Sequence, residues 1–193
     1  MQSTLRKPFN TRTNVFKISI CFAIVSILSF TSCSITNRVI GTATGDVSPE
    51  IIAKSSDGTD ISLSGLKGSY VLIEFWESGN SAARANHFEM QRLYQKYKSA
   101  EFEKGNGFCI YSLSLDTDKS KWANAIAQDK ITWPCQALDT RSWNASAAIN
   151  YQVGFLPQYF LIDGNGVIVK KNILIKDLDS IIKENLDNGS SSL

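Results

Sequence analysis

Two nearly continuous apolar runs constrain the fold of this chain more than any other feature. Residues 70–76 read YVLIEFW and residues 108–115 read FCIYSLSL, with Glu74 as the one charged residue in the two runs. Short runs rich in aromatic and β-branched side chains are typical of buried strands. Between them, over residues 80–98, apolar side chains recur at helical spacing at Phe88, Met90, Leu93 and Tyr94. The pattern predicts a buried strand, a long helix and a second buried strand.

Further short elements surround this unit. Two strand-like runs, at residues 50–53 and 60–63, flank Asp57-Gly58, a pair typical of hairpin turns. Downstream, the pattern predicts a helix over 119–128 with Trp122, Ala125 and Ile126 on one face, a strand over 131–138, a helix over 145–151, a hairpin over 159–170 and an amphipathic helix over 177–186. Strands that alternate with helices and end in a hairpin imply an α/β fold with a mixed central sheet flanked by helices.

The N-terminal residues have the composition of an export signal. Residues 1–17 are polar and basic, and residues 18–30 form an apolar run that is shorter than the roughly 20 residues of a membrane-spanning helix but typical of a secretory signal. The run ends in Phe30-Thr31-Ser32-Cys33. Small residues before a cysteine resemble a bacterial lipobox, which implies that Cys33 is acylated. A plain signal peptide cut near Ser32 and an uncleaved anchor are the alternatives.

All three interpretations place the rest of the chain outside the cytoplasm. We expect a protein of the bacterial cell envelope, lipid-anchored on a periplasmic or external face. The predicted organisation is a signal peptide with a lipobox over residues 1–33, a flexible Ser/Thr/Gly-rich tether over 34–47, one domain over 48–187 and a disordered tail over 188–193.

The charge balance argues against nucleic acid as a partner. The chain has 20 basic and 18 acidic residues, but four of the basic ones precede Cys33, which leaves 16 basic against 18 acidic residues. We find no basic patch typical of nucleic-acid binding. We also find no ligand cluster typical of a metal site, and we expect no cofactor.

Several sequence segments together resemble one family. Residues 71–76 (VLIEFW) look like the strand that leads into its active site, and residues 92–97 (RLYQKY) look like the end of its first helix. Residues 112–116 and 154–166 look like its third strand and its proline-containing final hairpin. The family is that of the TlpA/ResA-type thiol–disulfide oxidoreductases, related to the AhpC/TSA peroxiredoxins. The resemblance runs from about residue 47 to 186 and implies a thioredoxin-like fold with an N-terminal hairpin, an inserted helix–strand element and a cis Pro157.

The residues that carry the family's chemistry are replaced. The family motif is Trp-x-x-x-Cys-x-x-Cys-Arg, and Trp76 and Arg84 hold their places without a gap. Asn80 therefore stands at the nucleophile position and Ala83 at the resolving position. Exchange needs a thiolate, which a helix N-terminus favours, and neither side chain can form one. The peroxidatic cysteine of the AhpC/TSA relatives would also fall at Asn80, and Asn86 replaces a glutamate common in the family.

The resemblance implies a binding groove that needs no cysteine. In the family, the cis-proline borders a groove for an extended substrate strand, and the residue before it offers backbone hydrogen bonds. Carried over, the groove residues are Trp76, Gly79, Asn80, Leu156 and Pro157. Asn80 has two interpretations: a helix N-cap, worth about 1 kcal/mol over alanine, or a polar contact to a ligand. Trp76 also fits a core aromatic residue, as does Trp133.

The remaining cysteines and the one histidine have simple interpretations. Cys109 lies in a buried-looking strand and fits a small apolar side chain. If Asp116 and Asp139 mark the same end of neighbouring parallel strands, Cys135 lies level with Ser112, about 10 Å along the strand from Cys109. This separation predicts no disulfide between the two cysteines.

His87, the single histidine, has no evident catalytic partner. We predict an exposed or packed helix residue.

Three hypotheses for function remain open. The first is a redox-inactive, thioredoxin-like lipoprotein that binds a protein or peptide in the groove beside Pro157. The second is an active thiol–disulfide oxidoreductase or antioxidant protein that uses Cys109 or Cys135. The third is a structural partner subunit. Because the positions of the missing cysteines hold Asn80 and Ala83, we expect no catalytic residue there and favour the first hypothesis.

Overall fold

The computed structural model describes residues 39–187, which belong to one of the two compact units of the chain, residues 38–193. Cys33, the signal segment and the C-terminal tail therefore lie outside the described residues. The strands are β1 (Ile52–Lys54), β2 (Asp60–Ser62), β3 (Tyr70–Trp76), β4 (Glu101–Phe102), β5 (Gly105–Asn106), β6 (Phe108–Ser114), β7 (Cys135–Leu138), β8 (Gln158–Ile162) and β9 (Ile168–Lys171). The α-helices are α1 (Ser81–Tyr97), α2 (Lys119–Gln128), α3 (Ser146–Asn150) and α4 (Leu178–Lys183), with short 3-10 helices η2 (Leu63–Leu66), η3 (Ser142–Asn144) and η4 (Ile175–Asp177).

A seven-stranded mixed sheet organises the domain, in the order β2-β1-β7-β6-β3-β8-β9. β3 pairs in parallel with β6, and β6 pairs in parallel with β7. β8 and β9 add an antiparallel hairpin on the other side of β3, and β1 pairs with β2 in the N-terminal hairpin. The predicted mixed sheet and both hairpins are confirmed.

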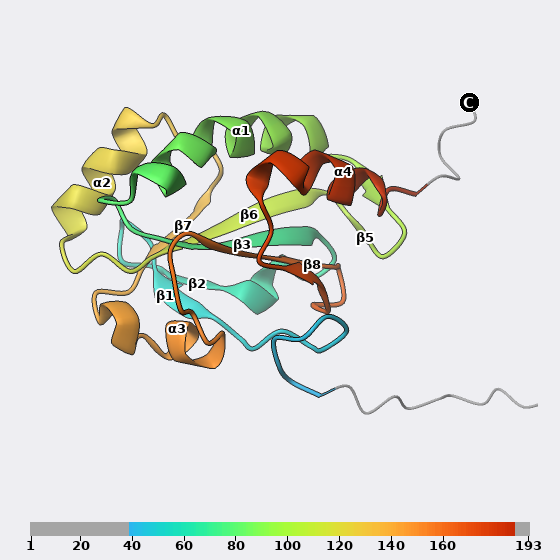
Figure 1. Cartoon of the computed structure of the whole chain (residues 1–193), viewed down its shortest axis with the longest axis horizontal. Helices are drawn as coiled ribbons and strands as arrows, with labels where there is room; N and C mark the ends of the chain where they lie inside the picture. The colour runs from blue at the N-terminus through green and yellow to red at the C-terminus, as the bar shows by residue number, and fades with distance from the viewer. Residues whose placement is uncertain (1–38, 188–193) are drawn as a thin grey trace, which may run out of the picture. The chain divides into compact units, whose positions relative to one another are not determined.

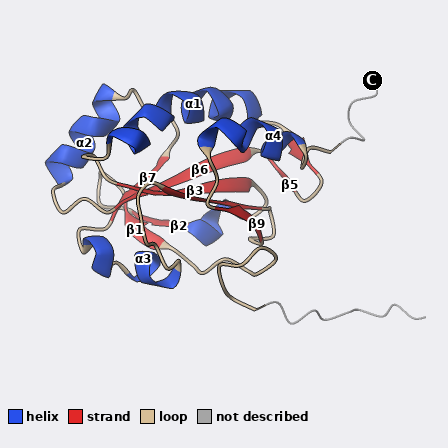
Figure 2. Cartoon of the chain, viewed as in Figure 1, coloured by secondary structure: helices blue, strands red, loops and turns tan. Residues whose placement is uncertain are grey.

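Helices cover both faces of this sheet. α1, α2 and α4 lie on one face and α3 lies on the other (Figure 1). Figure 2 shows the strands of this sheet as one layer between the helices. β4 and β5 form a separate two-stranded sheet. All seven residues of the central strand β3 are buried, because apolar side chains pack against both of its faces. Since β3 runs straight into the loop before α1, the rigid centre of the sheet positions the start of that helix.

Two sequence predictions need correction among the helices and strands. Phe88 does not belong to the buried stripe of α1 and is 80% exposed. The buried side chains of α1 are Ala83, His87, Met90, Leu93 and Tyr97, and Phe88 follows His87 by one residue, a rotation of about 100° away from that stripe. β7 begins at Cys135 and not at residue 131, since Pro134 has no N–H for a sheet hydrogen bond.

The predicted tether is wrong for its last residues. Residues 39–47 fold back on the sheet: Gly45 N–H donates to the Ile168 carbonyl at 2.9 Å, and Gly41 N–H donates to the Val47 carbonyl at 2.9 Å. Asp46 accepts a hydrogen bond from Ala43 N–H at 2.9 Å. Glycine and short polar residues are as typical of tight turns as of linkers, and here they form a turn.

Candidate functional site

Asn80 caps the N-terminus of α1 and also reaches across to the segment before Pro157. Its Oδ1 accepts a hydrogen bond from Ala83 N–H at 3.0 Å, which confirms the predicted N-cap. Its Nδ2 donates to the Leu156 carbonyl at 2.9 Å. The Leu156–Pro157 peptide bond is cis, as predicted. One carboxamide therefore joins the helix start to the cis-proline segment, 76 residues away along the chain.

The loop that delivers Asn80 is held by a carboxylate at the end of the neighbouring strand. Asp116, just after β6, accepts hydrogen bonds from Ser78 N–H at 2.8 Å and from Ser78 Oγ at 2.7 Å. Ser114 Oγ donates to the same carboxylate at 2.7 Å. This fixed loop sets the place of the helix start, and therefore of Asn80.

A groove of about 530 Å³ lies beside Pro157. Phe155 and Leu174 are 55% and 59% exposed on its walls. The other lining residues are Ala82, Asn86, Leu156, Pro157, Gln158, Tyr159, Asn172, Ile173, Ile175 and Lys176. Among the described residues that line it, Lys176 is the only charged one. The lining is therefore mainly apolar and also includes amide and hydroxyl side chains.

The structure revises the predicted list of groove residues. Leu156 and Pro157 line the groove, and Asn80 contacts Leu156 at its end. Trp76 is fully buried in contact with His87, at 4.6 Å between ring centroids, which confirms the core interpretation and excludes Trp76 as a lining residue. Gly79 is exposed beside the helix start but is not among the lining residues. Ala83, at the resolving position, is buried and faces the core.

A buried polar network connects the groove to the opposite side of α1. In the groove, Asn86 Nδ2 donates to Tyr159 Oη at 3.1 Å, and Tyr159 Oη donates to Glu74 Oε1 at 3.3 Å. Glu74 is fully buried, and its Oε1 lies 3.4 Å from His87 Nε2. His87 Nδ1 lies 2.8 Å from Asp129 Oδ2 at the end of α2.

Two further branches complete this network. Arg84 Nε donates to Asp129 Oδ2 at 2.8 Å. Ser112 Oγ donates to Glu74 Oε2 at 2.6 Å and accepts from Trp133 Nε1 at 3.0 Å. The prediction of Trp133 as a core residue is confirmed, but the partners of His87 were not predicted. The one available signal was Glu74, since a charged residue in a buried strand needs a partner.

The two carboxylates set the protonation of His87. Burial disfavours the charged ring and lowers its pKa, but the contacts with Glu74 and Asp129 outweigh burial, so that the pKa of His87 is raised above its ordinary value. Burial raises the pKa of Asp129, but hydrogen bonds from Arg84 and His87 outweigh it and leave that pKa below its ordinary value. The arrangement therefore favours an imidazolium ion inside the domain.

Cys109 and Cys135 are free thiols on the same side of the sheet. Cys135 pairs with Tyr111 and not with Ser112 as predicted, so its offset from Cys109 is two residues. Two residues along a strand and one strand across amount to about 8 Å between Cα atoms, beyond the range of a disulfide. Burial raises the pKa of Cys109, and burial together with Cys109 raises the pKa of Cys135 to about 11. Both thiols are therefore poor nucleophiles near neutral pH.

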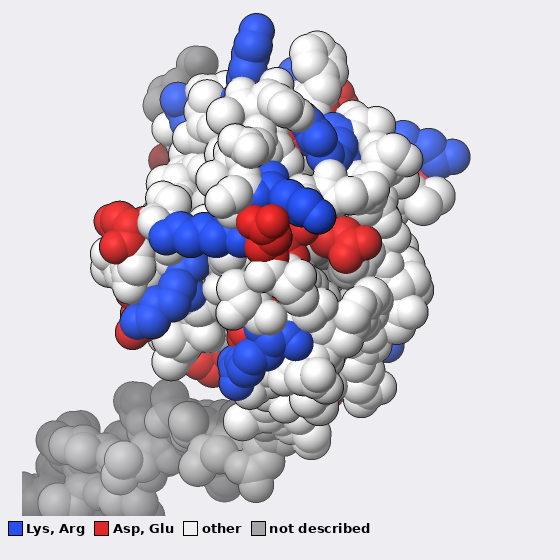
Figure 3. Space-filling model, turned by 90° about the vertical axis from the view of Figure 1, so that its left-hand side faces the viewer, with Lys and Arg blue, Asp and Glu red and all other residues white. Residues whose placement is uncertain are grey.

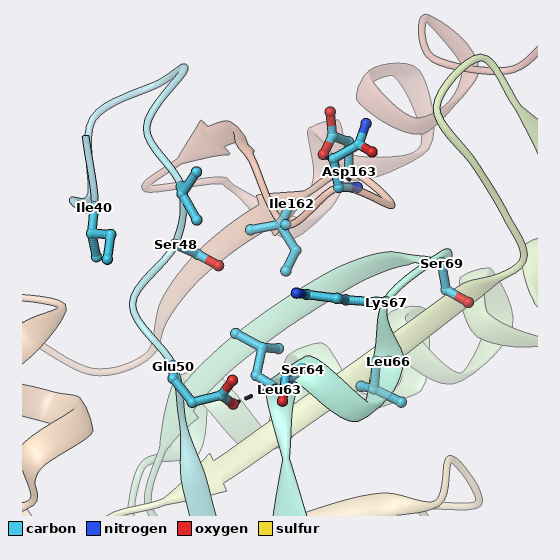
Figure 4. A pocket seen from close by; sticks show the side chains of 13 residues that line it. Ile40, Ser48, Glu50, Leu63, Ser64, Leu66, Lys67, Ser69, Ile162 and Asp163 are labelled. Atoms are coloured by element: carbon cyan, nitrogen blue, oxygen red, sulfur yellow. Dashed lines mark hydrogen bonds between the residues drawn. The ribbon is translucent and has the colours of Figure 1, made fainter. Parts of the chain in front are cut away.

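A second pocket lies at the other end of β3, remote from Asn80. Its volume is about 200 Å³, and Leu63, Leu66 and Ile162 are among its apolar lining residues. The Lys67 side chain lies across it (Figure 4), and Glu50 Oε1 accepts a hydrogen bond from Ser64 N–H at 3.0 Å. β3, which is seven residues long, separates this pocket from the start of α1. This pocket and the groove beside Pro157 share no lining residue.

The surface charges are mixed. On the face that Figure 3 shows, Lys and Arg side chains alternate with Asp and Glu side chains and do not form a patch of one sign. Within residues 39–187, no cluster of three or more His, Cys, Asp or Glu side chains is placed to hold a metal ion. In the same range, no helix has the length and apolar character needed to cross a bilayer.

The protonation of His87 predicts how stability depends on pH. In the unfolded chain its pKa returns to about 6.5. Because the folded pKa of His87 is higher, protonated His87 stabilises the folded protein. This stabilisation is complete below about pH 6.5 and is lost as the pH rises through the folded pKa. The lowered pKa of Asp129 acts at the acidic end, where its stabilisation is lost as the pH falls through the folded value. We therefore expect the free energy of unfolding, measured with urea, to be highest between these two pKa values.

The same histidine can be observed directly. His87 is the single histidine of the chain, so its imidazole protons give an unambiguous NMR titration, which we expect to be centred above 6.5. Asp129→Asn should move the titration to lower pH, and His87→Gln should remove the alkaline loss of stability that the imidazole causes. An imidazole that titrates at or below about 6.5 in the wild type would contradict the assigned network.

Comparisons with known proteins show the family of the chain. The redoxin family model matches residues 43–186. The thiol-disulfide oxidoreductase ResA of Bacillus cereus is 32% identical over 131 residues, which cover 67% of this chain and 69% of that protein. ResA of Oceanobacillus iheyensis is 25% identical over 169 residues, 86% of this chain and 82% of that protein.

Solved structures give the same result. The thioredoxin domain of a thiol-disulfide oxidoreductase from Bacteroides vulgatus has a TM-score of 0.68 and 31% identity, covering 75% of this chain and 99% of that chain. A thiol:disulfide interchange protein from Bacteroides sp. has a TM-score of 0.65 and 32% identity, covering 78% of this chain and 93% of that chain. The fold, the cis-proline segment and these similarities together show that the chain belongs to the redoxin family, among its TlpA/ResA-like members with a thioredoxin-like fold.

Proposed function

We propose that this protein is an exported, lipid-anchored member of its family that does not exchange thiols and disulfides, and that it binds an extended segment of a protein or peptide in the groove beside Pro157. The observation that carries the proposal is the double contact of Asn80. At the helix start where the chemistry needs a thiolate, a carboxamide is bonded to Ala83 N–H and to the Leu156 carbonyl.

Redox inactivity is supported by the state of the other thiols. Cys109 and Cys135 are partly buried, and each has a raised pKa. They lie on β6 and β7, away from the groove lining. The runner-up function is active thiol–disulfide exchange, which the names of the similar ResA proteins favour. It would require one of these two cysteines to act as the nucleophile.

Binding is supported by the groove itself. Its exposed apolar walls, Phe155 and Leu174, face solvent at more than half of their surface. Within the described residues, the Leu156 N–H has no hydrogen-bond partner. An exposed apolar wall beside an unpaired backbone donor is suited to an extended peptide, which contributes side chains to the wall and a carbonyl to the donor.

The redox part of the proposal is tested with insulin reduction by dithiothreitol. The wild-type protein should not accelerate the reaction. The double variant Asn80→Cys with Ala83→Cys restores two thiols one helical turn apart, with the first at the helix N-terminus, and should accelerate it. Wild-type acceleration that disappears in Cys109→Ser or Cys135→Ser would establish the runner-up function instead.

The groove is tested by site-specific photocrosslinking in cells that produce the protein. We place a photoreactive phenylalanine analogue at Leu174, 59% exposed in the groove, or at Ile149, 62% exposed on α3 outside it. We expect a discrete crosslinked partner from position 174 and none from position 149. Crosslinking from 149 alone would favour the structural-subunit hypothesis, in which the partner contacts another surface.

Lipid anchoring is tested on Cys33, which lies outside the described residues. Mass spectrometry of the mature N-terminus should find an acylated Cys33, and the protein should partition into a detergent phase. Cys33→Ser should abolish both properties. An unmodified N-terminus near Ser32 would support the plain signal peptide, and an intact Met1 would support the uncleaved anchor.

A further inference from the structure

Leu156 presents two backbone groups at the groove, and only one of them is available. The residue before a proline is held in an extended conformation, so its N–H and C=O can form an antiparallel bridge with an extended partner. The carbonyl already accepts a hydrogen bond from Asn80 Nδ2 at 2.9 Å. The N–H has no partner among the described residues.

The Asn80 amide is held in place from both ends. Its oxygen accepts from Ala83 N–H at 3.0 Å, which orients the nitrogen toward Leu156. Turning the amide away from Leu156 would therefore also cost the helix its cap. The Leu156 carbonyl oxygen has a second lone pair. A partner N–H that donated to this lone pair would lie next to Asn80 Nδ2, which donates to the same oxygen.

We propose that the groove selects segments in which the residue facing Leu156 has no N–H. Such a residue is a proline, here between apolar neighbours. This inference rests on the groove binding proposed above. Proline has no amide hydrogen, so nothing is left unpaired where Asn80 occupies the acceptor. Its carbonyl can still accept from the Leu156 N–H. Any other residue brings an N–H into the groove, and a buried donor without an acceptor weakens binding.

The groove walls fit such a segment. Phe155, Leu174 and Pro157 provide apolar surface, and proline-containing segments are recognised by grooves of this kind because they are already extended before binding. Lys176 is the one charged residue among those lining the groove. An uncharged apolar segment is therefore better suited than a basic one. Asn80 acts here as a specificity residue, not as a catalytic one.

The test uses three fluorescein-labelled peptides of the form Ala-Leu-X-Leu-Ala, in which X is alanine, N-methylalanine or proline. Dissociation constants are measured by fluorescence anisotropy with the full-length protein. For the wild type, we expect N-methylalanine and proline to bind roughly tenfold more tightly than alanine, the ratio that corresponds to about 1.4 kcal/mol. The decisive quantity is the change in this preference between the wild type and the variants. N-methylation also restricts the free peptide, but this effect on affinity is the same for every variant.

Asn80→Ser is the matched variant. Serine is an N-cap as good as asparagine, but its hydroxyl is too short to reach Leu156, so the carbonyl becomes available to the peptide. We expect the alanine peptide to gain affinity and the tenfold preference to fall to about twofold or less. Asn80→Asp, which keeps the cap and cannot donate, should behave in the same way. Circular dichroism checks that both variants are folded.

The outcomes separate this inference from the function on which it rests. An equal preference in the wild type and in both variants, or tighter binding of the alanine peptide by the wild type, would overturn the role of Asn80 while leaving groove binding intact. If none of the three peptides binds the wild type or Asn80→Ser, groove binding fails, and this inference fails with it.

Discussion

The carboxyl group of Glu74, fully buried in the central strand, is the constraint around which the polar interior of this domain is arranged. A buried charge is costly unless it is paired and hydrogen-bonded. β3 lies between β6 and β8, so the partners must come from those strands and from the covering helix. They do: Ser112 comes from β6, Tyr159 from β8 and His87 from α1. The position of α1 over the sheet is thereby set by polar contacts as well as by apolar packing.

The helix start shows how the fold holds together with an asparagine, Asn80, at this position. A cysteine at that position gains reactivity from the free N–H groups of the first turn. Asn80 uses the same environment for a structural purpose, since it satisfies Ala83 N–H. The amide then closes the gap to Leu156 with a second hydrogen bond. A thiol has weak hydrogen-bonding capacity, so this link between helix and cis-proline segment is specific to the substituted residue.

Local pattern was sufficient for most of the fold. The apolar run of β3 and the helix α2 were predicted with their observed bounds. In the structure, the Asp118 side chain caps α2. The cap at Asn80 and the cis Pro157 followed from residue type and from the family resemblance. What local pattern could not supply was contact between distant segments. The pairing of His87 with Asp129 spans 42 residues, and no periodicity in α1 indicates it.

The same limit explains the errors at the site. Trp76 was included in the groove because it starts the family motif, but the side chain of a strand residue next to a site points to one face or the other. Here it points to the core, against His87. Likewise, the contact between Asn80 and Leu156 depends on how the cis-proline segment sits against the helix, which no single segment determines. Of the predicted groove residues, Leu156 and Pro157 line the groove, whereas Trp76 and Gly79 do not.

Our central proposal is that this domain does not exchange thiols and disulfides although it has the thioredoxin-like fold. The most direct measurement is a redox titration of the protein in thiol–disulfide buffers, followed by alkylation and mass spectrometry of Cys109 and Cys135. Over potentials from about −350 to about −100 mV, which span the range of known exchange proteins, both thiols should stay reduced and no mixed disulfide should accumulate. A reversible two-electron transition that involves either cysteine would contradict the account.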